Sequence, residues 1–154
     1  MVDGNTRDGV QDIKDWIPTE FKEKVLDGLV AVGVPSIEIS SFVSPKAVPQ
    51  MADAAELTKY MNEKHPGVSF SVLAPNLRGV QNAAEAGAKD VNYVISASKA
   101  HNEANIRRTH EEPLADLAAL TGAFPNIRVN LAVATTIGCP CSRPGPTDLT
   151  LTIL

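Results

Sequence analysis

The sequence lacks the features that would assign the chain to a membrane or nucleic-acid-binding class. No apolar run approaches the roughly 20 residues that a membrane-spanning helix needs. No cluster of Lys and Arg is longer than Arg107-Arg108, and the formal net charge is −4. We therefore expect neither a membrane nor a nucleic acid among the partners of this chain.

The amino-terminal residues also lack the patterns that are typical of targeting segments. They show no basic stretch followed by an apolar one, as in a secretory signal, and they are not rich in Arg and Ser, as in a transit peptide. The predicted compartment is therefore the cytoplasm.

Cysteine is scarce, because Cys139 and Cys141 are the only two in the sequence. Their C-x-C spacing is unfavourable for a disulfide bond, and there is no second pair to complete a zinc site. We expect both to be free thiols in a reducing compartment.

Glycine-rich phosphate-binding motifs are missing as well. Neither G-x-G-x-x-G nor a Walker A pattern occurs, which weakens the case for a nucleotide-binding doubly wound fold. The remaining composition is ordinary for a globular protein: 154 residues, 44% of them hydrophobic and 21% charged. That length suits one domain with its own core, and we find no linker within residues 1–154.

Strand and helix patterns alternate along the chain. Apolar residues at helical spacing predict helices from Pro18 to Gly33, from Met51 to His65, from Pro75 to Gly87 and from Glu111 to Thr121. Short apolar runs predict strands over 36–40, 68–74, 91–96 and 127–134, and a first strand that ends at Arg7 and Asp8. Residues 98–109 read as a polar stretch. This alternation is typical of β/α units, so we predict an α/β fold with a parallel sheet.

Charged residues at strand ends are the first candidates for a site, because functional groups of parallel β/α proteins gather at the carboxyl ends of their strands. Arg7 and Asp8 follow the first predicted strand. Glu38 lies late in the second predicted strand, between two isoleucines, where an unpaired carboxylate would cost several kcal/mol. A metal ion or Arg7 would offset that cost. The alternative is a purely structural Arg7–Glu38 ion pair, with Asp8-Gly9 forming an ordinary turn.

Other polar residues are weaker candidates. The histidines do not have the spacing of a ligand pair, and we expect His65, which precedes Pro66 at a helix end, to lie on the surface. Two lysines could bind an anion, and the residues after the third strand could contact a substrate, although an asparagine there is also typical of a helix N-cap. These candidates are His65, His101, His110, Lys14, Lys46, Asn76, Arg78 and Cys139.

Several motifs together make the chain resemble a known family. They are Arg7-Asp8-Gly9-Val10-Gln11, Ile17-Pro18-Thr19-Glu20, Ile37-Glu38, Ser41-Phe42-Val43-Ser44-Pro45-Lys46, Val48-Pro49-Gln50-Met51-Ala52-Asp53, Pro75-Asn76-Leu77-Arg78-Gly79 and Gly138-Cys139-Pro140. In this order they resemble the amino-terminal half of the hydroxymethylglutaryl-CoA (HMG-CoA) lyases, which are DRE-TIM metallolyases with an HMGL-like barrel. The resemblance spans nearly the whole chain.

The resemblance implies a fold and an activity. The fold would be an incomplete TIM-type (β/α) barrel of about five β/α units. The activity would be metal-dependent cleavage of an acyl-CoA substrate, HMG-CoA, to acetyl-CoA and acetoacetate, a reaction of leucine catabolism and ketone-body metabolism. The cofactor would be a divalent cation, Mg²⁺ or Mn²⁺.

The resemblance also implies roles for individual residues. Asp8 would bind the metal. Arg7 would stabilise the enolate oxygen that develops on the acetyl-CoA product. Glu38 would help to handle the proton of the substrate hydroxyl. Gln11 and Lys14 would support the same corner and bind substrate.

The chain also departs from the family. The family's later metal ligands, a His-x-His pair and an asparagine, and its proton-transferring cysteine on a glycine-rich loop have no counterpart here, and Ile13 and Lys99 replace usual acidic residues. We therefore expect a truncated lyase-type chain that is inactive alone and forms a homo-oligomer or joins a complementing second half. The alternative is a non-catalytic half-barrel that assembles through its open sheet edges.

Overall fold

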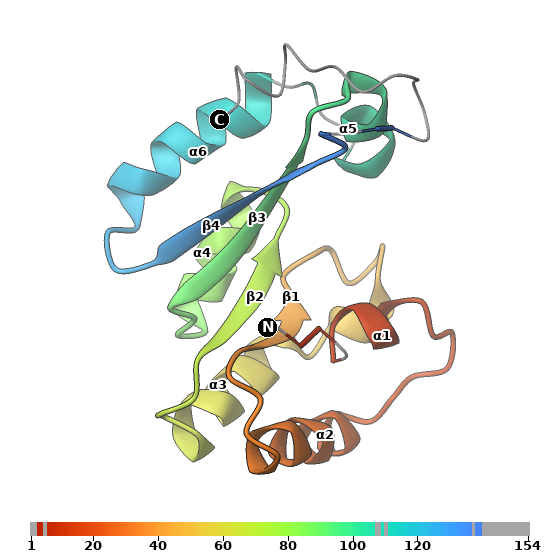
Figure 1. Cartoon of the computed structure of the whole chain (residues 1–154), viewed down its shortest axis with the longest axis vertical. Coiled ribbons are helices and arrows are strands. Elements are labelled where there is room, and N and C mark those ends of the chain that lie inside the picture. Colours follow the sequence, from red (N-terminus) through yellow and green to blue (C-terminus); the bar gives the residue numbers. More distant parts are fainter. Residues whose placement is uncertain (1–2, 5, 107–108, 110, 137, 140–154) are drawn as a thin grey trace.

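The computed structural model describes residues 3–139 except 5, 107, 108, 110 and 137 (Figure 1). The helices are α1 (Asp8–Gln11), α2 (Thr19–Ala31), α3 (Ala54–Lys64), α4 (Leu77–Glu85), α5 (Lys99–Ile106) and α6 (Glu111–Ala123), with a 3₁₀ turn at Pro49–Met51. The strands are β1 (Ile37–Ser41), β2 (Phe70–Ala74), β3 (Asp90–Ser96) and β4 (Arg128–Ala134).

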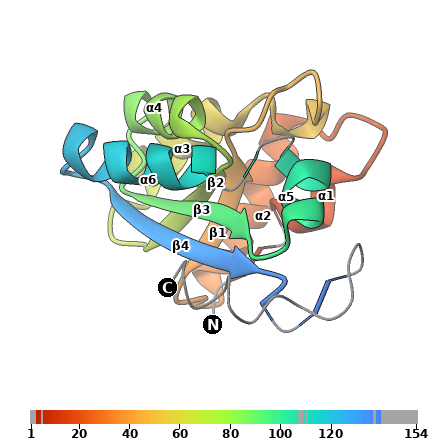
Figure 2. The ribbon, with the colours of Figure 1, turned by 90° about the horizontal axis from the view of Figure 1, so that it is seen from above.

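The strands form one parallel sheet in the order β1-β2-β3-β4. Helices α3, α4 and α6 lie over one face of this sheet (Figure 2). Strand residues that point toward the helices form the core, with Ile37, Val72, Val91 and Tyr93 fully buried there. The predicted alternation of strands and helices is confirmed, and with it the α/β class.

The predicted first strand is wrong in extent. Of the described residues before α1, only Asp3 pairs with β1, through a single bridge to Ile37. The carbonyl of Gly4 then accepts hydrogen bonds from the backbone N–H groups of Arg7 and Asp8, at 3.0 and 2.7 Å. These bonds turn the chain into α1 before a strand can extend, so the described sheet has four strands rather than about five.

A β-bulge in β1 changes which side chains face the helices. The pairing shifts between Glu38 and Ser40, so Ser40 lies opposite Val72 and Ser41 opposite Leu73. The Ser40 hydroxyl consequently contacts the sulfur of Met51 on the helix-covered side, at 3.5 Å. Strict alternation along the strand would place Ser40 on the same face as Glu38, and the bulge prevents this, because period-two alternation holds only where no residue is bulged.

Helix α2 buries a lysine that the apolar pattern overlooked. The ammonium of Lys22 contacts both carboxylate oxygens of Asp53, at 3.0 and 2.8 Å, and the carbonyl of Gln50 at 2.6 Å. Phe21, a predicted core residue, is instead exposed. The Thr19 hydroxyl donates to Asp53 at 3.0 Å and does not cap α2, whose N-cap residue is Pro18. Lys22 and Asp53 thus join α2 to the start of α3.

The last third of the chain contains one further helix and few described residues after β4. The stretch 98–109, which was predicted as polar, contains α5. In the described residues no helix is long and apolar enough to cross a membrane. Of the expected loop over 138–146 only Gly138 and Cys139 are described, and the terminal segment 147–154 lies outside the described residues.

Candidate functional site

The amino-terminal turn places Arg7 beside β1. Because α1 starts immediately after the bridge at Asp3, Arg7 stays next to the strand, and its Nε donates to Oε1 of Glu38. The Thr6 hydroxyl donates to the Glu38 carbonyl at 3.2 Å, and the Glu38 N–H donates to the Asp3 carbonyl at 2.7 Å. The backbone around the Arg7–Glu38 pair is therefore fixed on both sides.

Asp8 adds a second carboxylate to this corner. Its Oδ1 accepts from Arg7 Nη1 at 2.8 Å and from Gln11 Nε2 at 3.1 Å. The Asp8 side chain is 67% exposed, so an oxygen ligand here faces solvent. The structure thus gathers four of the five predicted site residues, Arg7, Asp8, Gln11 and Glu38, into the arginine–carboxylate corner. The fifth, Lys14, is exposed in the loop after α1 and contacts none of them through a hydrogen bond or ion pair.

Glu38 lies deeper than the sequence suggested. It is the second residue of β1, not a late one, and the whole residue is only 7% exposed. Both carboxylate oxygens have donors: Oε1 has Arg7, and Oε2 has the side-chain amide of Asn92 in β3. Burial without partners would be costly for an ionised carboxylate, and these two hydrogen bonds offset that cost.

Asn92 belongs to a polar layer that sequence reasoning missed. Its amide also donates to the Ser71 hydroxyl at 3.1 Å, and its oxygen accepts from Asn130 Nδ2 at 3.2 Å. With Glu38, this layer contributes one side chain from each of the four strands. The signal in the sequence was a polar residue in the middle of the apolar run Val91 to Ser96.

Gln50 fixes the loop that follows α1. Its amide nitrogen donates to the carbonyls of Ile13 and Asp15, and its amide oxygen accepts from the backbone N–H of Ile17 at 3.2 Å. The Gln50 side chain is buried and uses both a donor and an acceptor in this way. It therefore anchors residues 12–17 to the 3₁₀ turn before α3, and it is a second residue that the sequence analysis did not single out.

The weaker candidates fall elsewhere. His65 is largely buried and contacts Asp27 at 2.7 Å, so the expectation of a surface histidine is wrong. His101 Nδ1 contacts the Ser96 hydroxyl at 2.7 Å. Asn76 caps α4 through the Gly79 N–H at 2.9 Å. Cys139 donates to the Ser98 hydroxyl at 3.0 Å. Lys46 and Arg78 are exposed, while His110 and Cys141 lie outside the described residues.

Asp27 has the largest pKa displacement among the described carboxylates. Burial raises the pKa of Asp27, but hydrogen bonds from His65, Lys64 and Tyr60 outweigh burial and lower the pKa to about 2. The same contact raises the pKa of Lys64 above its ordinary value. These groups lie near the ends of α2 and α3 and stabilise the packing of those helices. They take no part in the arginine–carboxylate corner.

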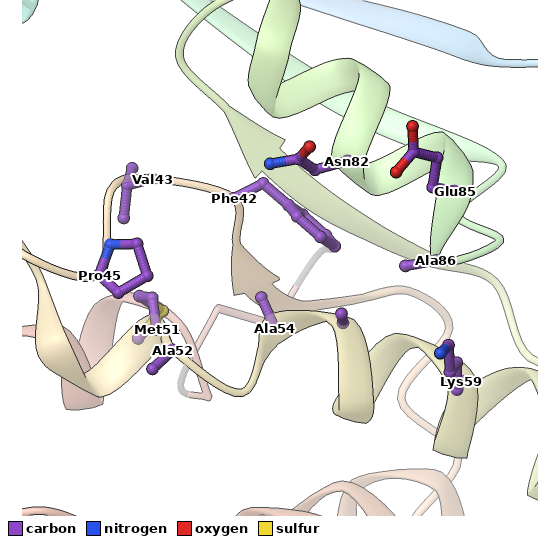
Figure 3. A pocket seen from close by; sticks show the side chains of 11 residues that line it. Phe42, Val43, Pro45, Met51, Ala52, Ala54, Lys59, Asn82, Glu85 and Ala86 are labelled. Carbon is purple, nitrogen blue, oxygen red and sulfur yellow. The ribbon is translucent and has the colours of Figure 1, made fainter.

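One described cavity is also separate from that corner. It has a volume of about 480 Å³ and lies between the loop after β1 and helices α3 and α4 (Figure 3). Phe42, Pro45 and Met51 form its apolar wall, and Lys59 and Glu85 lie at its charged side. None of the corner residues lines it, so the cavity and the corner are distinct features.

The described residues do not form a complete metal site by themselves. No group of three or more His, Cys, Asp or Glu side chains in the described part of the chain could hold a metal ion. Asp8 offers one exposed carboxylate of the kind that hard cations prefer. A divalent cation bound there would need further ligands, because affinity comes from several converging groups.

The fold and the corner together define a class. A parallel β/α sheet with helices on one face and an Arg–Asp–Glu corner is the arrangement of an α/β protein built as part of a (β/α) barrel. A family model described as HMGL-like matches residues 1–146. The chain therefore belongs to the HMGL-like family.

Known relatives agree with this assignment. The mitochondrial HMG-CoA lyase of Gallus gallus is 43% identical over 142 residues, which are 91% of this chain and 47% of that protein. An HMG-CoA lyase from Acenitobacter baumannii, solved with coenzyme A and 3-methylmalate, has a TM-score of 0.92 and 34% identity, and the match covers 99% of this chain and 50% of that one. The lyase from Brucella melitensis gives a TM-score of 0.87 at 35% identity, with 99% of this chain and 54% of that one covered.

The chain thus spans about half the length of the relatives that it matches. Its four-stranded sheet corresponds to about half of their TIM barrel. The predicted family and fold class are confirmed. The roles of Arg7, Asp8, Gln11, Lys14 and Glu38 stay predictions, as does the cytoplasmic location.

Proposed function

We propose that this chain carries the substrate-activating corner of an HMG-CoA lyase-type site. The observation that supports the proposal is the joining of Arg7, Asp8 and Glu38 by hydrogen bonds on one side of β1, within a chain whose relatives are HMG-CoA lyases. A purely structural Arg7–Glu38 ion pair would not need Asp8 as a second carboxylate. Holding the exposed Asp8 side chain against Arg7 restricts its conformational freedom and buries no apolar surface.

The proposed reaction is the cleavage of HMG-CoA to acetyl-CoA and acetoacetate. The C3 hydroxyl loses its proton and becomes the ketone of acetoacetate, while the C2–C3 bond breaks. The bonding electron pair moves onto C2 and the thioester oxygen as an enolate, and C2 then takes up a proton to give acetyl-CoA. We assign Glu38 to accept the hydroxyl proton and Arg7 to stabilise the enolate oxygen.

A divalent cation, Mg²⁺ or Mn²⁺, is the proposed cofactor, and it would supply Lewis acidity and orientation when bound. Asp8 is its proposed ligand in this chain. Gln11 holds the Asp8 carboxylate in place, and we assign Lys14 to electrostatic attraction of the anionic substrate. Because Asp8 is one ligand of several, we propose that the isolated chain binds the cation weakly and does not cleave HMG-CoA.

The ligands absent from residues 1–154 would then come from the other half of such a barrel. The three histidines of the sequence are 65, 101 and 110, and none are two residues apart, so the chain has no His-x-His pair. We propose that the carboxyl-terminal half of such a barrel completes the site.

Release of acetoacetate tests this proposal. The purified chain is assayed with HMG-CoA and Mg²⁺ or Mn²⁺, first alone and then mixed with the carboxyl-terminal half of the Brucella melitensis lyase. We expect metal-dependent acetoacetate only from the mixture, and a loss of about 10²-fold or more on Arg7→Gln. Arg128→Gln is the matched control, because Arg128 also pairs with an aspartate but lies at the start of β4 and is 76% exposed. Cleavage by the isolated chain would disprove its inactivity, and an active Arg7→Gln mixture would disprove the role of Arg7.

A second candidate function has one observation in its favour. Among the described strands, β4 pairs only with β3, and Leu131 in its centre is 36% exposed. An apolar edge strand is a template for association, so the chain could instead act as a non-catalytic half-barrel that self-assembles. Sedimentation velocity of the unsubstituted chain and of Leu131→Lys separates the two candidate functions. Assembly that is lost in Leu131→Lys, together with no acetoacetate from any mixture, supports the second function.

A further inference from the structure

We propose that Asn92 is a positioning residue that holds Glu38 in its working orientation. The inference rests on the proposed function for the role of Glu38, but the hydrogen-bond geometry behind it is independent of that function. No motif of the family resemblance includes Asn92.

The orientation of the Asn92 amide is determined by its partners. One amide N–H donates to Glu38 Oε2 and the other to the Ser71 hydroxyl, while the amide oxygen accepts from Asn130. An ionised carboxylate can only accept hydrogen bonds. Rotating the amide by 180° would place two oxygens face to face, so the nitrogen must point to Glu38.

Asn92 also comes from a rigid place in the fold. Strand β3 lies between β2 and β4, and Asn92 pairs in register with Leu73 on one side and Asn130 on the other (Figure 1). Its backbone is therefore held by neighbours on both sides. Arg7, the other donor to Glu38, lies at the start of a four-residue helix and is partly exposed.

This difference assigns separate tasks to the two donors. Arg7 supplies positive charge on the more exposed side of the corner, next to Oε1 of Glu38. Asn92 supplies a neutral hydrogen-bond donor from a rigid strand to Oε2 of the same carboxylate. A hydrogen bond to a charged group is stronger than one between neutral groups. Without Asn92, Glu38 would keep only its partly exposed partner, Arg7, and the carboxylate would lose the fixed orientation that the strand provides.

Nuclear magnetic resonance on the isotopically labelled full chain tests the anchor directly. We expect a scalar coupling across the hydrogen bond between Asn92 Nδ2 and the Glu38 carboxylate carbon. We also expect Asn92→Leu to speed exchange of the Arg7 Nε–H with water by about tenfold, because Glu38 is released. Asn130→Leu is the matched control, since it removes a partner of Asn92 without touching Glu38, and it should change that rate by less than about twofold.

A purely structural Asn92 predicts a different pattern. The proposal is overturned if the unsubstituted chain shows no coupling, if Asn92→Leu leaves Arg7 exchange unchanged, or if Asn130→Leu has the same effect. The coupling measurement needs no variant, so a failure of Asn92→Leu to fold does not prevent the test. Asn92→Ser provides a smaller polar replacement.

Kinetics connect the anchor to the reaction. In the mixture that releases acetoacetate, Asn92→Leu should lower kcat by about tenfold with KM within about twofold, and Asn130→Leu should change neither. An unchanged kcat would overturn the positioning role. Coupling without any acetoacetate from the mixture would instead refute the proposed function and leave the hydrogen-bond anchor in place.

Discussion

The buried Lys22–Asp53 pair allows a quantitative prediction about what holds α2 to α3. Its two side chains are 2% and 4% exposed. The Nζ–Oδ2 distance of 2.8 Å corresponds to a Coulomb attraction of about 6 kcal/mol at an effective dielectric constant of about 20. Desolvation of both groups offsets several kcal/mol of this. In Asp53→Asn the ammonium stays buried and keeps the Gln50 carbonyl at 2.6 Å and the Trp16 ring at 4.3 Å, but the side chain opposite it no longer carries a negative charge.

We expect Asp53→Asn to reduce the free energy of unfolding by about 3 kcal/mol, the low end of the range for a broken buried pair, because those two contacts remain. Urea unfolding followed by circular dichroism measures the loss. The double variant Lys22→Met/Asp53→Leu should recover about 2 kcal/mol relative to the sum of its single changes. Asp90→Asn is the matched control and should cost less than about 0.5 kcal/mol, since its partner Arg128 is exposed. A loss below about 1 kcal/mol for Asp53→Asn, or an equal loss for the control, would refute this account.

Further substitutions test other parts of the fold. The pKa of Asp27 is lowered from 3.8 to about 2 in the folded chain. The ionised carboxylate therefore contributes about 1 kcal/mol to the free energy of unfolding, after allowance for solvent screening. This contribution is present above about pH 5 and is lost as the pH falls toward about 2. The stability gap between the unsubstituted chain and Asp27→Asn should therefore close over that interval in urea titrations, and a constant gap would contradict it. Gly79→Ala should destabilise the fold by about 1–3 kcal/mol, because the added Cβ would lie 2.9 Å from a backbone oxygen. Gly28 has open space around it in α2, so Gly28→Ala should be neutral or stabilising by up to about 1 kcal/mol. Thermal melts that rank the two variants the other way would refute the packing argument. Gln50→Glu should expose the backbone of loop 12–17 to faster hydrogen exchange, because a carboxylate cannot donate to the carbonyls that the amide holds, and unchanged protection would show that the loop needs no such anchor.

The predictions from sequence held where the pattern is local. The 3.6-residue and two-residue periods located the main helices and four of the expected strands, since burying one face of an element is a property of consecutive residues. The helical pattern failed at Lys22, where a charged side chain occupies a buried position. It failed because the partner that makes this burial tolerable, Asp53, lies 31 residues away in the chain.

The candidate site divides in the same way. Arg7, Asp8 and Gln11 are close in sequence, so a short motif was enough to indicate the corner that they form. Asn92 could not be found in this manner, because its contact with Glu38 spans 54 residues and depends on the lateral order of the strands. The strand order and register that bring it to Glu38 result from the packing of the whole sheet.

The sequence by itself therefore determined the α/β class, the family and the Arg–Asp–Glu set, because each is written in short runs of residues. Tertiary structure alone decided that Lys22 is buried against Asp53, that the β1 bulge sends Ser40 to the helices, and that Asn92 meets Glu38. Those outcomes depend on hydrogen bonds between distant backbone and side-chain groups. Such bonds form only where the folded sheet brings their donors and acceptors within reach.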